Sequence, residues 1–157
     1  MTKEGIILVI DIDDSSARTS KDTLQQLCSN EVIIAETITK AQNMLDENHV
    51  VFSIINFSYN NDESMDFIKK IRKDTRGLNY KMPLLALIEK NSKTNEQHVL
   101  NAGASKCILK PFSTSQLKDE ILDIISNPKN FIISDNYIGP DRRIKSIETK
   151  HEKRKTR

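Results

Sequence analysis

Several residue types that mark special classes of protein are scarce in this sequence. Its 157 residues include four glycines, four prolines, two cysteines and no tryptophan. With 37% hydrophobic and 29% charged residues, the composition excludes a collagen-like chain, a coiled-coil rod and a wholly disordered chain. No apolar run approaches the roughly 18 residues that a membrane-spanning helix needs. The length fits one domain with a short additional segment.

The cysteine content and the first residues point to the cytoplasm. Cys28 and Cys107 are too few for a disulfide framework, and they lack the spacing of a metal site. The first four residues run straight into a short apolar segment followed by acids, without the cleavage pattern of a signal peptide. We therefore expect a protein of the reducing cytoplasm that does not insert into a membrane.

Short apolar runs alternate with segments that have helical spacing of apolar residues. The runs predict strands over residues 6–10, 32–35, 50–55, 83–88 and 107–109. The predicted helices lie over 15–28, 39–45, 62–72, 94–103 and 113–125, with Ser15 or Ser16, Thr39, Asp62, Thr94 and Ser113 as expected N-caps. Ser113 and Gln116 have the spacing of a capping box, and Gly103 is expected to end its helix. Five alternations of strand and helix predict an α/β fold, a parallel (βα)5 sheet with helices on both faces.

The charge divides the chain into two parts. Residues 1–127 carry a formal charge of −3, whereas residues 128–157 contain nine basic and four acidic residues and carry +5. We predict a domain over 1–127 and a basic C-terminal tail over 128–157 that is partly disordered. The tail contains one apolar patch, formed by 131–133 and 137–140. This patch either folds back on the domain or docks on a partner.

An acidic cluster follows the first predicted strand. In an open parallel sheet, ligands bind at the carboxyl ends of the strands, where Asp11, Asp13 and Asp14 are expected to lie. Carboxylates this close repel one another unless a cation lies between them, and Mg²⁺ is the usual cation. The alternative is that Asp13 and Asp14 only precede and cap the first helix.

A lysine and a proline follow the fifth predicted strand. Lys110 would point its ammonium group at the same cleft, and Lys110–Pro111 is the kind of bond that can be cis and fix a turn. Together with the preceding segment, these residues resemble a known family. The chain is similar over residues 5–127 to the receiver domains of bacterial two-component response regulators, which are CheY-like. The resemblance is carried by the acids 11–14, by Ala35 and Ala41, and by the segments 67–72, 82–87 and 102–112.

The resemblance implies a flavodoxin-like three-layer fold with strand order 2-1-3-4-5 and a phosphorelay function. In the family, an aspartate that ends the third strand accepts a phosphoryl group, with Mg²⁺ and the lysine neutralising its charge. Here that position is Asn56. Ile88 stands where a hydroxyl residue is expected, Cys107 where the family has an aromatic switch, and Ile12 where a second acid is expected. Asp13 can substitute for that acid only if the loop shifts by one residue.

These departures favour a pseudo-receiver, which we define as a receiver fold that binds proteins without being phosphorylated. No catalytic residue is expected, Mg²⁺ is not required, and a weak Mg²⁺ site stays open. Lys110 is predicted to pair with Asp11 or with the Asn56 oxygen and to hold one conformation. The expected partner is a histidine kinase, a phosphotransfer protein or a downstream effector. The resemblance implies that it binds the fourth helix, fifth strand and fifth helix, with candidates Gln97, Leu100, Lys106, Gln116 and Asp119. A homodimer stays open.

Two other functions compete with this interpretation. Asp11-x-Asp13 after an apolar strand resembles the nucleophile motif of haloacid-dehalogenase-type phosphatases, with Asp11 attacking phosphate and Asp13 acting as acid and base. The basic residues of the tail could contact nucleic acid, but neither a recognition helix nor stacking aromatic residues accompany them. We therefore do not expect nucleic-acid binding.

Overall fold

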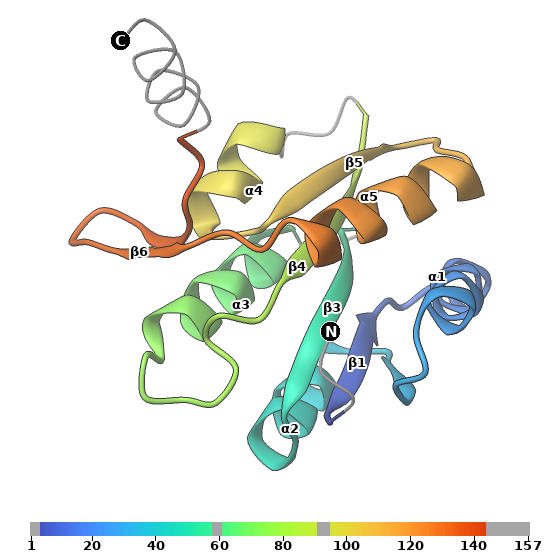
Figure 1. Cartoon of the computed structure of the whole chain (residues 1–157), viewed down its shortest axis with the longest axis horizontal. Helices are drawn as coiled ribbons and strands as arrows, with labels where there is room; N and C mark the ends of the chain where they lie inside the picture. Colours follow the sequence, from blue (N-terminus) through green and yellow to red (C-terminus); the bar gives the residue numbers. More distant parts are fainter. Residues whose placement is uncertain (1–3, 58–60, 91–94, 144–157) are drawn as a thin grey trace, which may run out of the picture.

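The computed structural model describes residues 4–57, 61–90 and 95–143. Five strands form one parallel sheet in the order β2-β1-β3-β4-β5, as the sequence predicts. The strands are β1 (Ile6–Ile10), β2 (Val32–Ala35), β3 (Val50–Phe57), β4 (Leu84–Glu89) and β5 (Lys106–Lys110). The helices are α1 (Asp14–Leu27), α2 (Ile38–Glu47), α3 (Asn61–Lys73), α4 (Glu96–Ala102) and α5 (Thr114–Ser126). The predicted α/β fold is confirmed (Figure 1).

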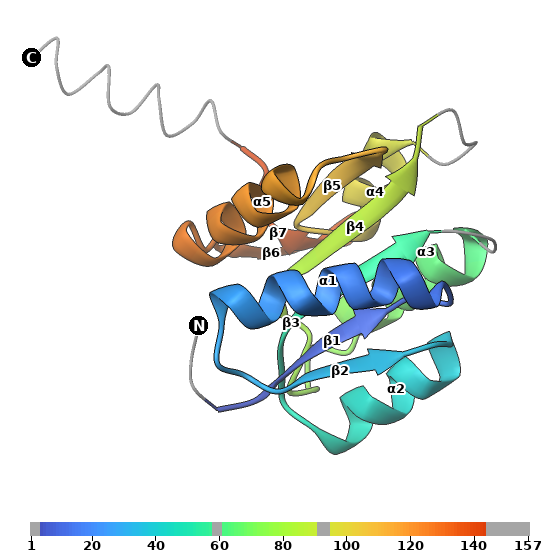
Figure 2. The ribbon, with the colours of Figure 1, turned by 90° about the vertical axis from the view of Figure 1, so that its right-hand side faces the viewer.

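The helices cover both faces of the sheet because successive side chains of a strand point to opposite sides. Ile7 and Val9 of β1 pack in one core with buried residues of α1 and α5. Leu8 and Ile10 pack in a second core with residues of α2, α3 and α4. Figure 2 shows α1 crossing in front of the strands. The strands are continuous apolar runs because both of their faces are buried.

The helix boundaries correct several predicted N-caps. Asp13, rather than Ser15 or Ser16, caps α1, and Thr37, rather than Thr39, caps α2. Asp62 lies inside the first turn of α3, and Thr94 lies outside the described residues, so that Asn95 is the N-cap seen for α4. Ser113 does cap α5, in the predicted capping box with Gln116. Gly103 ends α4 with a φ of 120°, as expected for a glycine stop.

The apolar patch of the predicted tail forms a hairpin of β6 (Phe131–Ile133) and β7 (Ile138–Pro140). The hairpin folds back on the domain near α3 and α4 rather than extending into solvent (Figure 1). A Cβ on Gly139 would lie 3.1 Å from the Gly103 Cα atom, so the hairpin backbone approaches the end of α4 closely. The predicted disorder of the last residues, 144–157, falls outside the described part of the chain.

A buried arginine lies under this hairpin. The Arg72 side chain, only 1% exposed, donates hydrogen bonds to the carbonyl oxygens of Gly103, Tyr80 and Met82 over 2.7–2.9 Å. Its guanidinium carbon lies 4.9 Å from the centre of the Phe131 ring. Burial lowers the pKa of Arg72 to about 10. Arg72 therefore ties α3, the segment before β4, the end of α4 and the hairpin together.

Candidate functional site

Asp11 and Asn56 meet at the carboxyl ends of neighbouring strands. Asp11 directly follows β1, and Asn56 is the next-to-last residue of β3, which pairs with β1. The Asn56 side chain donates from Nδ2 to Asp11 Oδ1 over 2.9 Å. The two residues are 8% and 3% exposed. Asn56 occupies the position where the resemblance places a phosphoacceptor, and its amide group donates a hydrogen bond to Asp11.

The other two acids of the predicted acidic pocket have structural contacts. The Asp13 carboxylate accepts a hydrogen bond from the backbone N–H of Ser16 over 3.1 Å, and the backbone N–H of Asp13 donates to Asp11 Oδ1. Asp14 lies in the first turn of α1 and pairs with Arg18 on the exposed surface. Of the three acids, only Asp11 lines the cleft. Ile12 lines it as well, but its apolar side chain supplies no ligand atom.

The cleft contains two buried oxygens that make no hydrogen bond to any described residue: Asp11 Oδ2 and Asn56 Oδ1. Both residues line a hollow of about 360 Å³ together with Glu36, Thr37 and Glu63. Unpaired buried acceptors are costly, so atoms like these mark a place where a donor or a cation binds.

The donor set does not fit the Mg²⁺ ion that the family implies. Mg²⁺ demands near-ideal octahedral oxygen coordination and is usually held by one or two carboxylates. Here one of the two free oxygens belongs to a neutral amide, and the Asp13 carboxylate caps a helix. Among the described residues, no group of three or more metal-binding side chains converges. We therefore derive no chemistry from a bound metal.

Lys110 does not make the contact that the sequence predicted. Its ammonium group pairs with Glu89 Oε1 over 3.2 Å, not with Asp11 or with the Asn56 oxygen. Glu89 ends β4 and Lys110 ends β5, and the two residues are direct neighbours across the parallel strands. The pairing follows from this register. The Lys110–Pro111 peptide bond is cis.

Ile88 and Cys107 lie in or beside the core. Ile88 is fully buried in β4 and neighbours Phe57 of β3 and Leu109 of β5. The Cys107 thiol is partly buried, and burial together with the nearby Glu96 raises its pKa to about 12. Ile88 carries no hydroxyl group, and the Cys107 thiol stays neutral at physiological pH.

Sequence reasoning missed Glu89 and Arg72. A signal for Glu89 was present, because it is the first charged residue after the apolar run of β4, just as Lys110 follows the run of β5. A signal for Arg72 was also present, since it falls four residues after the buried Ile68 on the inner face of α3.

Comparisons with known proteins agree with this geometry. A family model described as response regulator receiver domain matches residues 7–122. A chemotaxis protein CheY homologue of Campylobacter jejuni is 28% identical over 121 residues, which cover 76% of this chain and 91% of that protein. Chemotaxis protein CheY1 of Helicobacter pylori is 28% identical over 116 residues, covering 73% of this chain and 92% of the relative.

Solved structures share the fold. A CheY-like receiver domain protein from Methanospirillum hungatei superposes with a TM-score of 0.64 at 23% identity, covering 76% of this chain and 92% of the other. A signal receiver domain from Bermanella marisrubri gives a TM-score of 0.65 at 24% identity, with coverages of 76% and 96%. No helix in the described part of the chain is long and apolar enough to cross a membrane. The chain belongs to the family of response regulator receiver domains and is a CheY-like signalling domain.

Proposed function

We propose that this receiver domain works in the cytoplasm as a phosphorylation-independent protein-binding module of a two-component pathway. The observation that carries the proposal is the buried hydrogen bond from Asn56 to Asp11. An amide nitrogen that donates to a carboxylate is not a nucleophile, and the amide oxygen cannot form the acyl phosphate that an aspartate forms. The site therefore lacks the group on which receiver phosphorylation depends.

Two further features support the same conclusion. A phosphoryl group at this site would find no hydroxyl at Ile88, which forgoes a charge-assisted hydrogen bond of roughly 1.5–3 kcal/mol. Lys110 is already paired with Glu89, a carboxylate of the chain itself. The lysine that would neutralise a phosphoryl group in the family is therefore already paired within the chain.

The surface formed by α4, β5 and α5 is the proposed contact for a histidine kinase, a phosphotransfer protein or a downstream effector. It carries two exposed apolar side chains, Leu109 of β5 at 38% and Leu122 of α5 at 44%. Gln97 of α4 and Gln116 and Asp119 of α5 are exposed as well. Lys106 is held by Glu120 and Asp123, so it is partly neutralised. A mixed apolar and polar surface of this kind suits a protein partner rather than nucleic acid.

The test is incubation of the full chain with acetyl phosphate and Mg²⁺, followed by intact-mass measurement. We expect no phosphoryl adduct, because Asn56 offers no carboxylate. The matched variant is Asn56→Asp, which restores that carboxylate next to Asp11 and should acquire a labile adduct. A stable adduct on the wild-type chain that maps beside Asn56 would contradict the proposal.

The phosphatase alternative receives no support from the fold or from the relatives. Asp11 Oδ1 already accepts hydrogen bonds from Asn56 Nδ2 and from the Asp13 backbone. Asp13, the proposed acid and base, turns its carboxylate to the start of α1. The two side chains are therefore not arranged as a nucleophile with its proton donor.

A further inference from the structure

The cleft beside Asp11 opens into a longer groove between α2 and α3. The hollow of about 360 Å³ at Asp11 and a hollow of about 580 Å³ along the two helices share Ile38, Thr39 and Glu63 as lining residues. We call this continuous feature the acidic groove. Its carboxylates are Asp11, Glu36, Asp62, Glu63 and Asp66, and its single lysine is Lys70. The lining therefore carries a formal charge of −4.

The arrangement of these carboxylates suits an extended cation better than a single ion. They are distributed over the ends of β1 and β2 and the first two turns of α3, and no three of them converge among the described residues. At the Asp11 end of the groove, Asp11 Oδ2 and Asn56 Oδ1 are buried acceptors without a described partner. A ligand with several separated N–H donors would complement both features.

Lys110 does not neutralise the groove, because it pairs with Glu89. Lys40 contacts Glu36 only over 3.4 Å on the exposed surface, where such a pair contributes little. Neither Lys110 nor Lys40 is therefore a strong counter-charge for the acidic groove.

The same chain supplies a segment of matching charge. Residues 144–157 contain six basic and two acidic residues, a formal charge of +4. They follow Arg143, next to the hairpin that packs against α3. Fourteen residues can reach at most about 46 Å, whereas a 13-residue helix such as α3 is only about 20 Å long. The segment can therefore reach the groove, and its covalent link raises its local concentration to the millimolar range.

We propose that residues 144–157 bind in the acidic groove of the same molecule, with lysine and arginine side chains donating to the groove carboxylates. One of these donors would reach Asp11 Oδ2 and Asn56 Oδ1. The bound segment would cover the cleft where a receiver is ordinarily phosphorylated. This inference rests on the proposed function, since a cleft that had to be phosphorylated could not stay covered.

A zero-length carbodiimide cross-linker tests the contact in the full chain, because it joins a lysine amine to a carboxylate only when the two touch. We expect cross-links from Lys150, Lys153 or Lys155 to Asp62, Glu63 or Asp66 in the monomeric fraction. They should disappear in about 0.5 M NaCl, where the Debye length falls to about 4 Å. This readout reports only where the segment binds, whereas the phosphorylation assay reports only the chemistry at Asn56, so the two proposals fail separately.

Mixing unlabelled and ¹⁵N-labelled protein identifies cross-links between molecules. Cross-links that are all intermolecular would overturn the proposal, as would no cross-link or a spread over exposed carboxylates such as Asp22 and Asp119. Loss of the groove cross-links on adding Mg²⁺ at constant ionic strength would overturn it as well, because the cleft would then prefer the ion.

A second measurement does not depend on the cross-linked groups. The variant Asp62→Asn/Glu63→Gln/Asp66→Asn should be cleaved by trypsin within residues 144–157 about tenfold faster than the wild type, because several surface ion pairs are lost. The matched control is Asp22→Asn/Glu31→Gln/Asp119→Asn, which removes the same charge from exposed sites elsewhere. Equal cleavage rates in the two variants would contradict the proposal.

Discussion

Buried polar side chains have different hydrogen-bond partners at the two ends of the sheet. At the amino ends of the strands, buried side chains bond to several backbone groups from different elements. At the carboxyl ends, Asp11 and Asn56 bond to each other, and each keeps an oxygen without a described partner. Ser53 Oγ and Arg72 Nη2 are also buried without a described partner, but only Asp11 and Asn56 line the cleft, where such atoms can meet a ligand.

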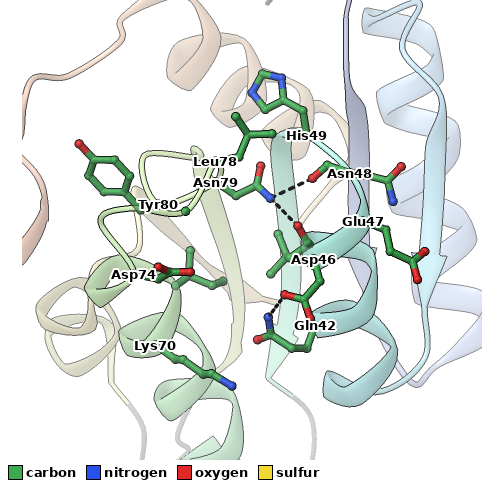
Figure 3. Close-up of a pocket in the computed structure, with 13 residues that line it drawn as sticks. Gln42, Asp46, Glu47, Asn48, His49, Lys70, Asp74, Leu78, Asn79 and Tyr80 are labelled. Carbon is green, nitrogen blue, oxygen red and sulfur yellow. Dashed lines mark hydrogen bonds between the residues drawn. The ribbon is translucent and has the colours of Figure 1, made fainter.

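Asn79 shows how the amino end is closed. Its oxygen accepts the backbone N–H of Val50 over 2.8 Å, and its nitrogen donates to the carbonyl oxygens of Leu45 and Asn48. Asn79 lines a hollow of about 440 Å³ between the ends of α2 and α3, and Figure 3 shows it turned toward the end of α2. This hollow is larger than the 360 Å³ cleft at Asp11, but its buried amide has no unused hydrogen-bonding atom. Volume alone therefore does not identify the functional end.

The largest expected effect comes from removing the Arg72 contacts at the amino ends of the strands. Arg72→Ala should lower the free energy of unfolding by about 3–4 kcal/mol, because three buried carbonyl oxygens lose their donor and a cavity forms under Phe131. Urea denaturation measures the loss. The control is Arg76→Ala on the exposed surface, which should change stability by less than about 0.5 kcal/mol. Equal losses would mean that Arg72 does not tie the elements together.

An intermediate effect is expected at the carboxyl end. Asn56→Asp places a second carboxylate beside Asp11 and should cost about 2 kcal/mol near pH 7. The two carboxylates repel each other only while both are charged, so the variant should regain stability when one is protonated at acidic pH or when Mg²⁺ is added. Thermal unfolding measures this, with Asn43→Asp on α2 as the exposed control. A variant as stable as the wild type at every pH would refute the expected repulsion.

The smallest effect concerns the Glu89–Lys110 pair. The Glu89 side chain is 54% exposed, so Glu89→Gln should cost no more than about 0.5 kcal/mol at low salt and less at high salt. Thermal unfolding at two salt concentrations measures this against Glu47→Gln, which removes an exposed carboxylate from α2. A loss of several kcal/mol would show that this end is held as firmly as the amino end.

Local patterns predicted the elements well where the partners are close in sequence. The strand over 6–10 and the one over 32–35 have the predicted bounds, because continuous apolar runs are buried on both faces. The Ser113–Gln116 capping box is confirmed because both residues lie in one turn. The cap predicted at Thr39 is wrong because Thr37, two residues earlier, can make the same bond. Several such side chains near one helix start cannot be ranked from sequence alone.

The position of Asn56 at the end of a buried strand, and its lack of a carboxylate, were determined by the sequence itself. The sequence also determined the opposite charges of residues 1–127 and 128–157. Only the tertiary structure decided that Lys110 pairs with Glu89, because the register of two parallel strands makes these residues neighbours although they are far apart in the chain. It also decided that Arg72 is buried, because the helix face, the segment before β4, the glycine after α4 and the hairpin must all be brought together before its contacts exist.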